Sequence, residues 1–429
     1  MIILSEIHIK KLFSNRRKKE TKTLFILGSF LISIIVYFSY IKYNPLFIKD
    51  FPIINIDFKG ELDYEDYSDC TFELENCKDS DKIEPLDSKI RLRGSGSGWN
   101  KMSPKKGYRL ELSEPKSLLG MRNDDDWLLF ALYFDYSRMR IKLSMELWRD
   151  LLPTNPTAIL PDSEYVCLYV NGEFQGLYLL VEKNDRRLFN LDDAQNCINS
   201  SLIFQTKYET NIKRYEEDAW EQDWPNEYEG ISIMDNMLVD LIYFINQPLD
   251  EMFFHHKNGI FTKFNKQNLI DFYVFNFFID HQDFWNHNYF VVRNSFPQKF
   301  FFIPWDFDRS LGGYMWDNYD SDINSESEIR KLNALYNRLL NNCSFREDCK
   351  NRWFELRNMI WTEEHILDML TEIYNEIKQV LELDVDLWNS REPLLFREDK
   401  QNNIEESVRN LFNWIPERLQ YCNIYFHAI

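Results

Sequence analysis

The chain has 429 residues, 16% of them aromatic, and a net charge of −19 at pH 7. This length supports a large core in two or three lobes, and the aromatic content excludes a globally disordered chain. Residues 1–22 carry seven basic and two acidic side chains, a net +5, which leaves −24 for the rest. An acidic body repels phosphate backbones, so the charge argues against nucleic-acid binding and suits basic protein partners.

Residues 23–41 (TLFILGSFLISIIVYFSYI) contain no charged side chain. A helix of this length crosses the hydrocarbon core of a bilayer. Because the basic flank precedes it, the positive-inside rule keeps the N-terminus in the cytosol and the body in a lumen or outside the cell. We predict a cytosolic tail at 1–22 and a transmembrane signal anchor at 23–41. A cleaved signal peptide is the alternative, but the bulky end of the stretch offers no small-residue cleavage site.

Seven cysteines are compatible with an oxidising compartment. Cys70 lies close to Cys77 in the sequence, and Cys343 lies close to Cys349. Each pair could close a local disulfide, and seven separate thiols are the alternative.

Strand patterns dominate the first part of the body. Residues 42–88 are predicted to form a linker and an acidic surface excursion that lead into a sheet-rich lobe at 89–185. An amphipathic helix at 137–151 interrupts this lobe, with apolar residues at positions 139, 143 and 147. Asn171-Gly172 predicts a hairpin turn. The expected strands are 89–94, 107–112, 126–134, 164–170 and 176–183.

Residues 186–429 are predicted to form a helical lobe, so the fold class is α+β. Within it, 289–293 and 299–303 have the pattern of two strands joined by a turn. If these strands pair antiparallel, Asn288 lies near Asp306. In an extended stretch Asp306 and Asp308 face the same way. Their carboxylates and the Asn288 amide oxygen form an oxygen-rich set that suits Mg²⁺, which in such sites usually also binds a polyphosphate.

Asp283 precedes Asn288 by five residues. The spacing His281-x-Asp283-x-x-x-x-Asn288 is that of the protein-kinase catalytic loop, with Gln282 in place of the usual Arg. In that scheme the Asp accepts the proton of the substrate hydroxyl, the Asn binds one metal ion, and Asp306 binds the metal from the position of the Asp-Phe-Gly motif. Helix and turn capping is the alternative role for each residue taken alone.

Phosphate-binding parts are expected upstream. The loop RGSGSGW (93–99) follows a strand, and its glycines allow backbone amides to approach phosphate oxygens. Lys106, or Lys105 if the register slips, could pair the phosphates, and Glu146 could hold that lysine. A surface pair with Lys142 is the alternative for Glu146. The predicted nucleotide-binding residues are Arg93, Gly94, Ser95, Gly96, Ser97, Lys105, Lys106, Glu146 and Glu182, the last at the strand end where a hinge would meet adenine.

From residue 51 to 425 the chain resembles the spore coat protein H (CotH) family of atypical protein kinases. The resemblance rests on the segments RLRGSGSG, PKKGYRLEL, DDDWLLFALYFDYSRMRIKLSMELWRDL, YVCLYVNGEFQGLYLLVEK and HNYFVVRN…FFIPWDFDRSLGG. It implies a kinase-like fold with two lobes, ATP with Mg²⁺ or Mn²⁺, and phosphoryl transfer to Ser or Thr of a protein. Asp283 matches the catalytic Asp, and Asn288 and Asp306 match the metal ligands.

One departure from the family concerns the glycine loop, where Arg-Gly-Asn-Ser-Ser is typical and this chain has Arg93-Gly94-Ser95-Gly96-Ser97. Some family members act as cell-surface adhesion proteins, so a non-catalytic adhesin or receptor on the same fold is the second hypothesis. A glycosyltransferase is the third, because a single anchor and a D-x-D motif are also its layout. The strand-rich sequence that precedes the D-x-D motif fits that class poorly.

Overall fold

The computed structural model describes residues 51–94, 101–226, 234–247, 249–282, 285–313, 320–389 and 404–429. Contacts divide the chain into residues 1–50 and a compact unit of residues 51–429. The predicted cytosolic tail and transmembrane anchor both fall before residue 51 and lie outside the described residues. Within the described ranges, no helix combines the length and the apolar character needed to span a bilayer.

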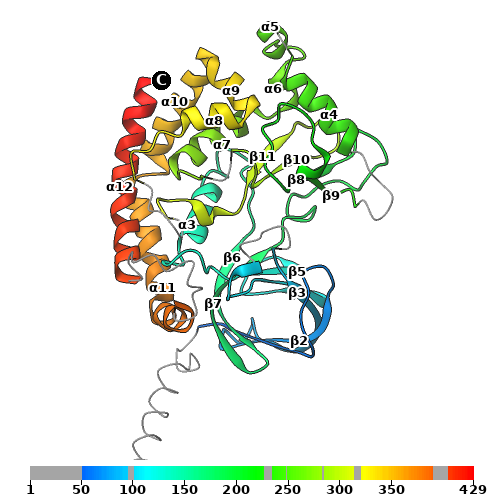
Figure 1. Cartoon of the computed structure of the whole chain (residues 1–429), viewed down its shortest axis with the longest axis vertical. Coiled ribbons are helices and arrows are strands. Elements are labelled where there is room, and N and C mark those ends of the chain that lie inside the picture. The colour runs from blue at the N-terminus through cyan, green and yellow to red at the C-terminus, as the bar shows by residue number, and fades with distance from the viewer. Residues whose placement is uncertain are drawn as a thin grey trace, which may run out of the picture. The chain divides into compact units, whose positions relative to one another are not determined.

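The first part of the compact unit is a closed β-barrel with the strand order β1-β2-β3-β4-β5-β7-β6 (Figure 1). Strand β1 pairs in parallel with β6 and so closes the barrel, while the other neighbours are antiparallel. The strands are β1 Ile53–Phe58, β2 Ser68–Glu75, β3 Ile83–Leu92, β4 Tyr108–Ser117, β5 Asn123–Phe130, β6 Ser163–Val170 and β7 Glu173–Glu182.

Apolar side chains at alternate positions of the strands fill the barrel interior. In β4, Tyr108, Leu110 and Leu112 are buried while the residues between them are partly exposed, as expected for a strand with one face on a core. They join an apolar cluster drawn from every strand of the barrel. The predicted turn between β6 and β7 is confirmed, since Asn171 and Gly172 have φ of 50° and 75°, the left-handed values that a tight hairpin requires.

The acidic stretch 61–87 differs from its prediction. It is not a surface excursion, because it contains β2 and the start of β3, and the barrel begins at Ile53, well ahead of residue 89. Cys70, Phe72 and Leu74 alternate in β2 and face the core. The acidic residues between them occupy the outward positions, and their charge conceals a strand pattern of period two.

The two predicted disulfides are wrong. All seven cysteines lie in the described ranges, and all are free thiols. The chain runs extended from Cys70 to the end of β2, which at about 3.3 Å per residue carries it beyond the Cα separation that a disulfide spans. Cys343 and Cys349 both lie in helix α10, six residues apart, so they are about 9 Å apart along the axis and on different faces. Cys343 is exposed and Cys349 is buried.

The second part of the unit is largely helical, as predicted, and the fold is mixed α+β. Its four-stranded sheet has the order β11-β10-β8-β9. Helices α10, α11 and α12 stand together at the left of Figure 1. The sheet strands are β8 Leu202–Thr206, β9 Trp220–Trp224, β10 Tyr289–Arg293 and β11 Phe301–Pro304. The helices are α3 Arg140–Arg149, α4 Met234–Ile245, α5 Asp250–Phe253, α6 Ile260–Lys263, α7 Lys266–Phe278, α8 Glu326–Leu332, α9 Ala334–Asn341, α10 Cys343–Met359, α11 Glu363–Asn389 and α12 Ile404–Ala428, with short 3₁₀ turns η2 Glu217–Ala219 and η4 Phe307–Arg309.

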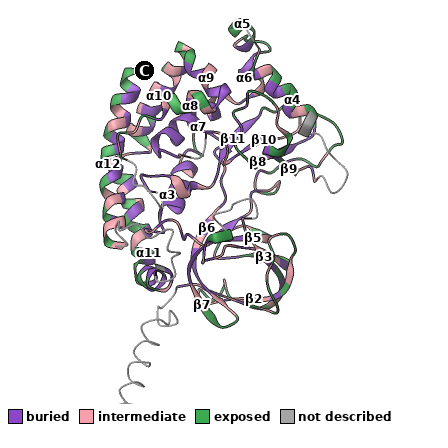
Figure 2. Ribbon diagram, in the orientation of Figure 1, coloured by how far each residue is buried: buried purple, intermediate pink, exposed green. Residues whose placement is uncertain are grey.

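Helix α7 fixes the sheet in place from the middle of this part (Figure 2). It is buried from Asn268 to its end, which explains an apolar sequence without a polar stripe. The Asn268 side chain donates to the Phe302 carbonyl at 3.0 Å and accepts from the Phe302 N–H at 2.7 Å. Arg418 of α12 donates to the Phe277 and Phe278 carbonyls at the other end, where a helix lacks partners for its last carbonyls.

Candidate functional site

Asn288 and Asp306 flank the hairpin of β10 and β11. The predicted pairing is confirmed, with Tyr289 opposite Pro304. The Trp305 N–H donates to the Asn288 carbonyl at 2.9 Å, which extends the ladder by one step. Asn288 therefore lies opposite Trp305 and next to Asp306, at the open end of the hairpin.

The backbone at both residues is left-handed. Asn288 has φ of 60° and Asp306 has φ of 61°, a region that Asn and Asp enter more readily than most residues. The 3₁₀ turn η4 starts directly after Asp306. The expectation that Asp306 and Asp308 lie on one extended stretch is therefore wrong, because this turn re-aims the chain. The side chains of Asp306 and Asp308 are both half-buried.

His281 holds the Asp306 backbone. Its ring is 1% exposed, and Nε2 lies 2.9 Å from the Asp306 carbonyl oxygen. Because a carbonyl only accepts, Nε2 carries a hydrogen and donates. Burial lowers the pKa of His281 to about 3, so the ring is neutral. The neighbouring Gln282 N–H donates to the Arg309 carbonyl at 3.0 Å, which fastens the same turn a second time.

Arg93 lies where the barrel packs against this hairpin. Its guanidinium lies 3.9 Å from the centre of the Phe130 ring, and Phe130 packs edge-on against Trp305 at 5.6 Å between centroids. Burial lowers the pKa of Arg93, and the carboxylates of Asp306 and Asp308 oppose that shift. The next residue, Gly94, has φ of 92°, which favours glycine. The start of the predicted glycine loop thus lies beside the predicted metal ligands.

Four predicted site residues cannot be placed. Asp283, the predicted catalytic residue, lies outside the described ranges. So do Ser95, Gly96 and Ser97 of the glycine loop.

Helix α3 contacts the turn that follows Asp306 through residues that the sequence did not single out. Arg140 Nε donates to the Leu311 carbonyl at 3.3 Å, and the hydroxyl groups of Ser144 and Ser310 lie 3.1 Å apart. Asp135 accepts from the Arg140 backbone and guanidinium. The sequence signal is three basic residues at alternate positions, Arg138, Arg140 and Lys142, at the start of the predicted amphipathic helix, and the structure buries all three.

Glu146, on the same helix, forms the local pairs that were its alternative. Its carboxylate lies 3.1 Å from Lys142 Nζ and 3.5 Å from Arg149 Nη1. Pairs of this spacing are common on helices.

Lys105 belongs to a buried ionic joint. Its Nζ lies 2.6 Å from Asp384 Oδ1 of α11 and donates to the Leu177 carbonyl at 2.6 Å. Asp384 also accepts from Arg138 Nε at 2.8 Å and from the Leu177 N–H at 2.8 Å. The pairing of β7 with β5 ends at Leu179, opposite Phe130, so β5 does not reach Leu177. Lys105 and Asp384 take the place of a paired strand there and satisfy the N–H and the carbonyl of Leu177. Lys105 therefore has a structural role, and its ammonium group is not available to bind a ligand.

Lys106 and Glu182 also have local partners. Lys106 is half-buried and donates to the Lys101 carbonyl at 2.8 Å. It precedes β4, so strand parity does not direct its side chain. Glu182 is buried at the end of β7 and accepts from the backbone N–H groups of Arg122 and Asp162, at 2.8 and 3.0 Å. Its carboxylate therefore holds the strand end that leads into the second part.

A second acidic group lies at the end of the barrel. Among the described residues, Asp124, Asp126 and Asp185 have carboxylates close enough to share a metal ion. Arg122 and Arg187 each lie within 3.0 Å of carboxylates in this group, and Lys183 lies 3.1 Å from Asp126. These cations already neutralise the carboxylates, so the group is explained without a metal.

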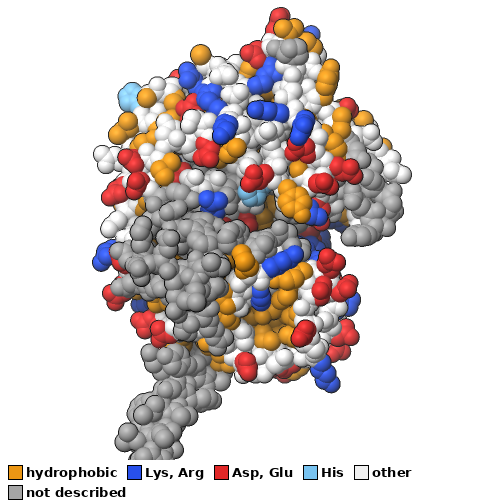
Figure 3. Space-filling view, viewed as in Figure 1, with side chains coloured by type: hydrophobic (Ala, Val, Ile, Leu, Met, Phe, Trp, Pro, Cys, Tyr) orange, Lys and Arg blue, Asp and Glu red, His pale blue; other side chains and the backbone are white. Residues whose placement is uncertain are grey.

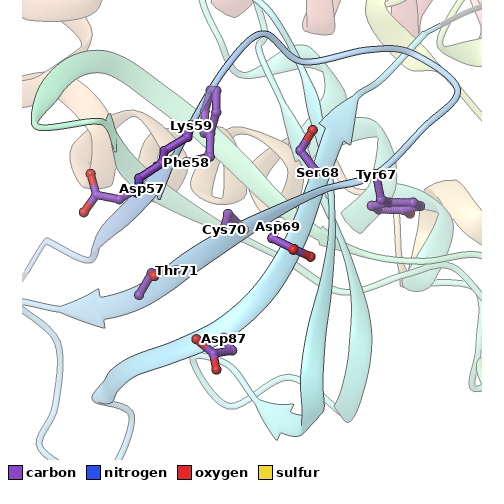
Figure 4. Close-up of a pocket in the computed structure, with 9 residues that line it drawn as sticks. All are labelled: Asp57, Phe58, Lys59, Tyr67, Ser68, Asp69, Cys70, Thr71 and Asp87. Atoms are coloured by element: carbon purple, nitrogen blue, oxygen red, sulfur yellow. The ribbon is translucent and has the colours of Figure 1, made fainter.

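An open groove of about 660 Å³ lies on the barrel over β1, β2 and β3 (Figure 4). It is lined by three carboxylates, those of Asp57, Asp69 and Asp87, and one lysine, Lys59. A surface of this charge repels phosphate groups. The groove is therefore a poor candidate for a nucleotide site, and its lining includes none of the residues predicted to bind a nucleotide or a metal ion. Elsewhere on the face shown in Figure 3, acidic and basic side chains are interspersed.

The buried neutral imidazole of His281 predicts acid sensitivity. Its pKa is about 3 in the folded protein and about 6.5 when unfolded. Between these values the unfolded chain binds the extra proton, so stability is complete above pH 6.5 and falls as the pH drops toward 3. The loss amounts to roughly 3–5 kcal/mol at the acid limit.

Urea denaturation with a chelator present, at pH 7.5 and at pH 4.5, measures this effect. In His281→Gln we expect the stability difference between the two pH values to shrink by about 2 kcal/mol or more. An unchanged difference would show that His281 is already protonated in the folded protein.

Comparison with known proteins places the chain in a family. The sequence matches the family described as CotH kinase protein over residues 90–422. Inner spore coat protein H of Bacillus subtilis (strain 168) is 26% identical over 358 residues, which cover 78% of this chain and 86% of that protein. The crystal structure of the Helicobacter pylori proinflammatory kinase CtkA aligns with 75% of this chain and 94% of that chain, at 11% identity and a TM-score of 0.27, which is too low to support an argument. Because the family match covers well over half of the chain, this protein belongs to the CotH family.

Proposed function

We propose that the protein is an atypical protein kinase that transfers the γ-phosphoryl group of ATP to Ser or Thr of a protein, with Mg²⁺ or Mn²⁺. The observation that carries the proposal is the hairpin geometry, which sets Asn288 beside Asp306. Arg93 lies within electrostatic range of the carboxylates of Asp306 and Asp308. Membership of a family of kinase proteins supports it. The finer proposal is a two-lobed kinase fold, with the barrel as the first lobe and the helical part as the second.

The donor set fits a divalent ion. An amide oxygen and one or two half-buried carboxylates are the hard oxygen ligands that Mg²⁺ and Mn²⁺ bind. Asn288 and Asp306 would hold the ion, and Asp308 is the further candidate. The bound ion would neutralise phosphate charge. His281 keeps the Asp306 backbone in place, and Asp283 would accept the proton of the substrate hydroxyl.

The location of the protein is also a proposal. The uncharged stretch 23–41 and its basic N-terminal flank support a single-pass anchor with the body in a lumen or outside the cell. Carbonate extraction tests the anchor, because a spanning protein stays with the membrane. Protease treatment of sealed vesicles tests the orientation, because a lumenal body is protected.

Transfer of label from [γ-³²P]ATP to a mixture of proteins tests the activity. The purified body should label Ser or Thr residues when Mg²⁺ or Mn²⁺ is present, and EDTA should abolish the signal. Asp69→Asn, in the acidic groove on the barrel, is the matched control and should label as the natural protein does. Absence of transfer with every metal tried would reject the kinase proposal and favour a binding-only role.

A further inference from the structure

Arg109 lies on the same outer face of the barrel as Arg93 and Phe130. Strand register places Arg109 opposite Arg91 on one side and Leu128 on the other. Directly opposite residues share a face, and so do residues two apart. Phe130 follows Leu128 by two, and its ring packs against Trp305. Arg109 therefore lies on the face that Trp305 and the adjacent Asp306 approach.

The Arg109 guanidinium has no hydrogen bond or ion pair within the part of the chain that the structure describes, although the residue is half-buried. Its neighbour Arg91 is held through one terminal nitrogen of the guanidinium, although its buried Nε has no partner among the described residues. Arg91 Nη1 donates to the Tyr64 and Glu65 carbonyls at 2.8 and 3.2 Å, and the guanidinium lies 4.8 Å from the Tyr67 ring centre. These two adjacent arginines thus differ in that Arg91 is tied by hydrogen bonds to a loop of the barrel, whereas Arg109 forms no hydrogen bond or ion pair with any described residue.

Charges from the second part of the unit lie near Arg109. Asp223 of β9 is exposed, and its carboxylate lies within electrostatic range of Arg109 and Lys183. The charge of Arg109 also acts on Arg93, together with those of Asp306 and Asp308. Arg109 is therefore within electrostatic range of Arg93 and of β9, and Arg93 is in turn within range of Asp306 and Asp308.

We propose that Arg109 and Arg93 form the basic pair that binds the phosphates of the nucleotide, in the role first assigned to a lysine. This inference rests on the proposed function. Lys106, the first candidate, donates to the Lys101 carbonyl, and Lys105, its alternative, is committed to Asp384 and Leu177 and is not available for a phosphate. A guanidinium is always charged, and its fork of donors matches phosphate oxygens. Two guanidinium groups would offset two of the negative charges that remain on a metal-bound polyphosphate.

Binding measurements separate phosphate contacts from the rest of the nucleotide. The experiment is a calorimetric titration of the purified body with Mg²⁺-ATP, Mg²⁺-ADP and adenosine. It compares the natural protein with the variants Arg109→Gln and Arg91→Gln. We expect Arg109→Gln to raise the Kd for ATP and ADP by roughly ten- to a hundredfold. The Kd for adenosine should be unchanged. Arg91→Gln should stay within about twofold for all three ligands, since its guanidinium serves a loop of the barrel. Arg109→Lys keeps the charge and should retain part of the affinity.

The outcomes are distinguishable. If the natural protein binds adenosine and ATP but Arg109→Gln binds ATP equally well, this inference is wrong while the kinase proposal stands. If Arg109→Gln weakens ATP and adenosine to the same extent, the residue supports the fold and not the phosphates, and the inference is again wrong. If the natural protein binds no nucleotide in the presence of Mg²⁺ or Mn²⁺, the proposed function fails and this inference fails with it.

Discussion

Replacing Asp384 with alanine is expected to lower the free energy of unfolding by about 3–5 kcal/mol, the cost of breaking a buried pair by removing one partner. Lys105, Arg138 and Asp384 are all buried, and the carboxylate accepts hydrogen bonds from both cations and from the Leu177 N–H. Without it, two positive charges remain in the interior with no counter-charge. The same change removes a contact between α11 and the barrel.

Urea denaturation followed by far-ultraviolet circular dichroism measures this loss. Glu382→Ala is the matched control, because Glu382 lies two residues before Asp384 on α11, on the exposed face of the helix. It should change stability by less than about 0.5 kcal/mol. Gly176→Ala probes the same joint from β7, because an added Cβ would clash with Asp384 Oδ1. Stability of Asp384→Ala within about 1 kcal/mol of the natural protein would show that the joint contributes little.

Asp306→Asn is expected to reduce phosphoryl transfer by roughly a hundred- to a thousandfold while leaving stability nearly unchanged. Asparagine keeps the size of the side chain and tolerates the left-handed backbone at φ 61°. The His281 contact is to the backbone carbonyl, so it survives the change. What is lost is one negative charge at the position proposed to hold the metal ion.

The transfer assay of the labelled phosphoryl group, run at several Mn²⁺ concentrations, measures the effect. We expect the variant to need more metal for its residual activity, because the carboxylate is replaced by a weaker ligand. Asp308→Asn, run in parallel, tests whether the second carboxylate shares the ion. Full activity of Asp306→Asn at ordinary Mg²⁺ would remove this residue from the metal site.

Local patterns predicted much of the fold. The strand alternation and the Asn171-Gly172 turn predicted β6 and β7 to within three residues of their observed bounds, and the start but not the end of β4. The hairpin that joins Asn288 to Asp306 was also predictable, because its two strands are near in sequence and one pairing rule fixes their ends. Period-two alternation of apolar residues in β2 was present as well, but the acidic residues between them directed attention to the surface.

Long-range contacts were beyond such patterns. Lys105 and Asp384 are 279 positions apart, and no periodicity links one to the other. The sequence therefore allows Lys105 as the alternative to Lys106 for a phosphate ligand, and only its partner on α11 removes it from that role. Arg109 was overlooked for the converse reason. Its alternation with Tyr108 and Leu110 marks it as an outward residue, and only the arrangement of the second part shows that this outward face is covered by the hairpin.

The central claim is that one divalent ion and a nucleotide are bound between the barrel and the β10–β11 hairpin. A crystal structure of the protein soaked with Mn²⁺ and a non-hydrolysable ATP analogue tests it most directly, because the anomalous signal of Mn²⁺ locates the ion independently. We predict a Mn²⁺ ion coordinated by the Asn288 amide oxygen and the Asp306 carboxylate, with the phosphates facing Arg93 and Arg109. A nucleotide bound elsewhere, or Asn288 and Asp306 free of metal at saturating Mn²⁺, would contradict the claim.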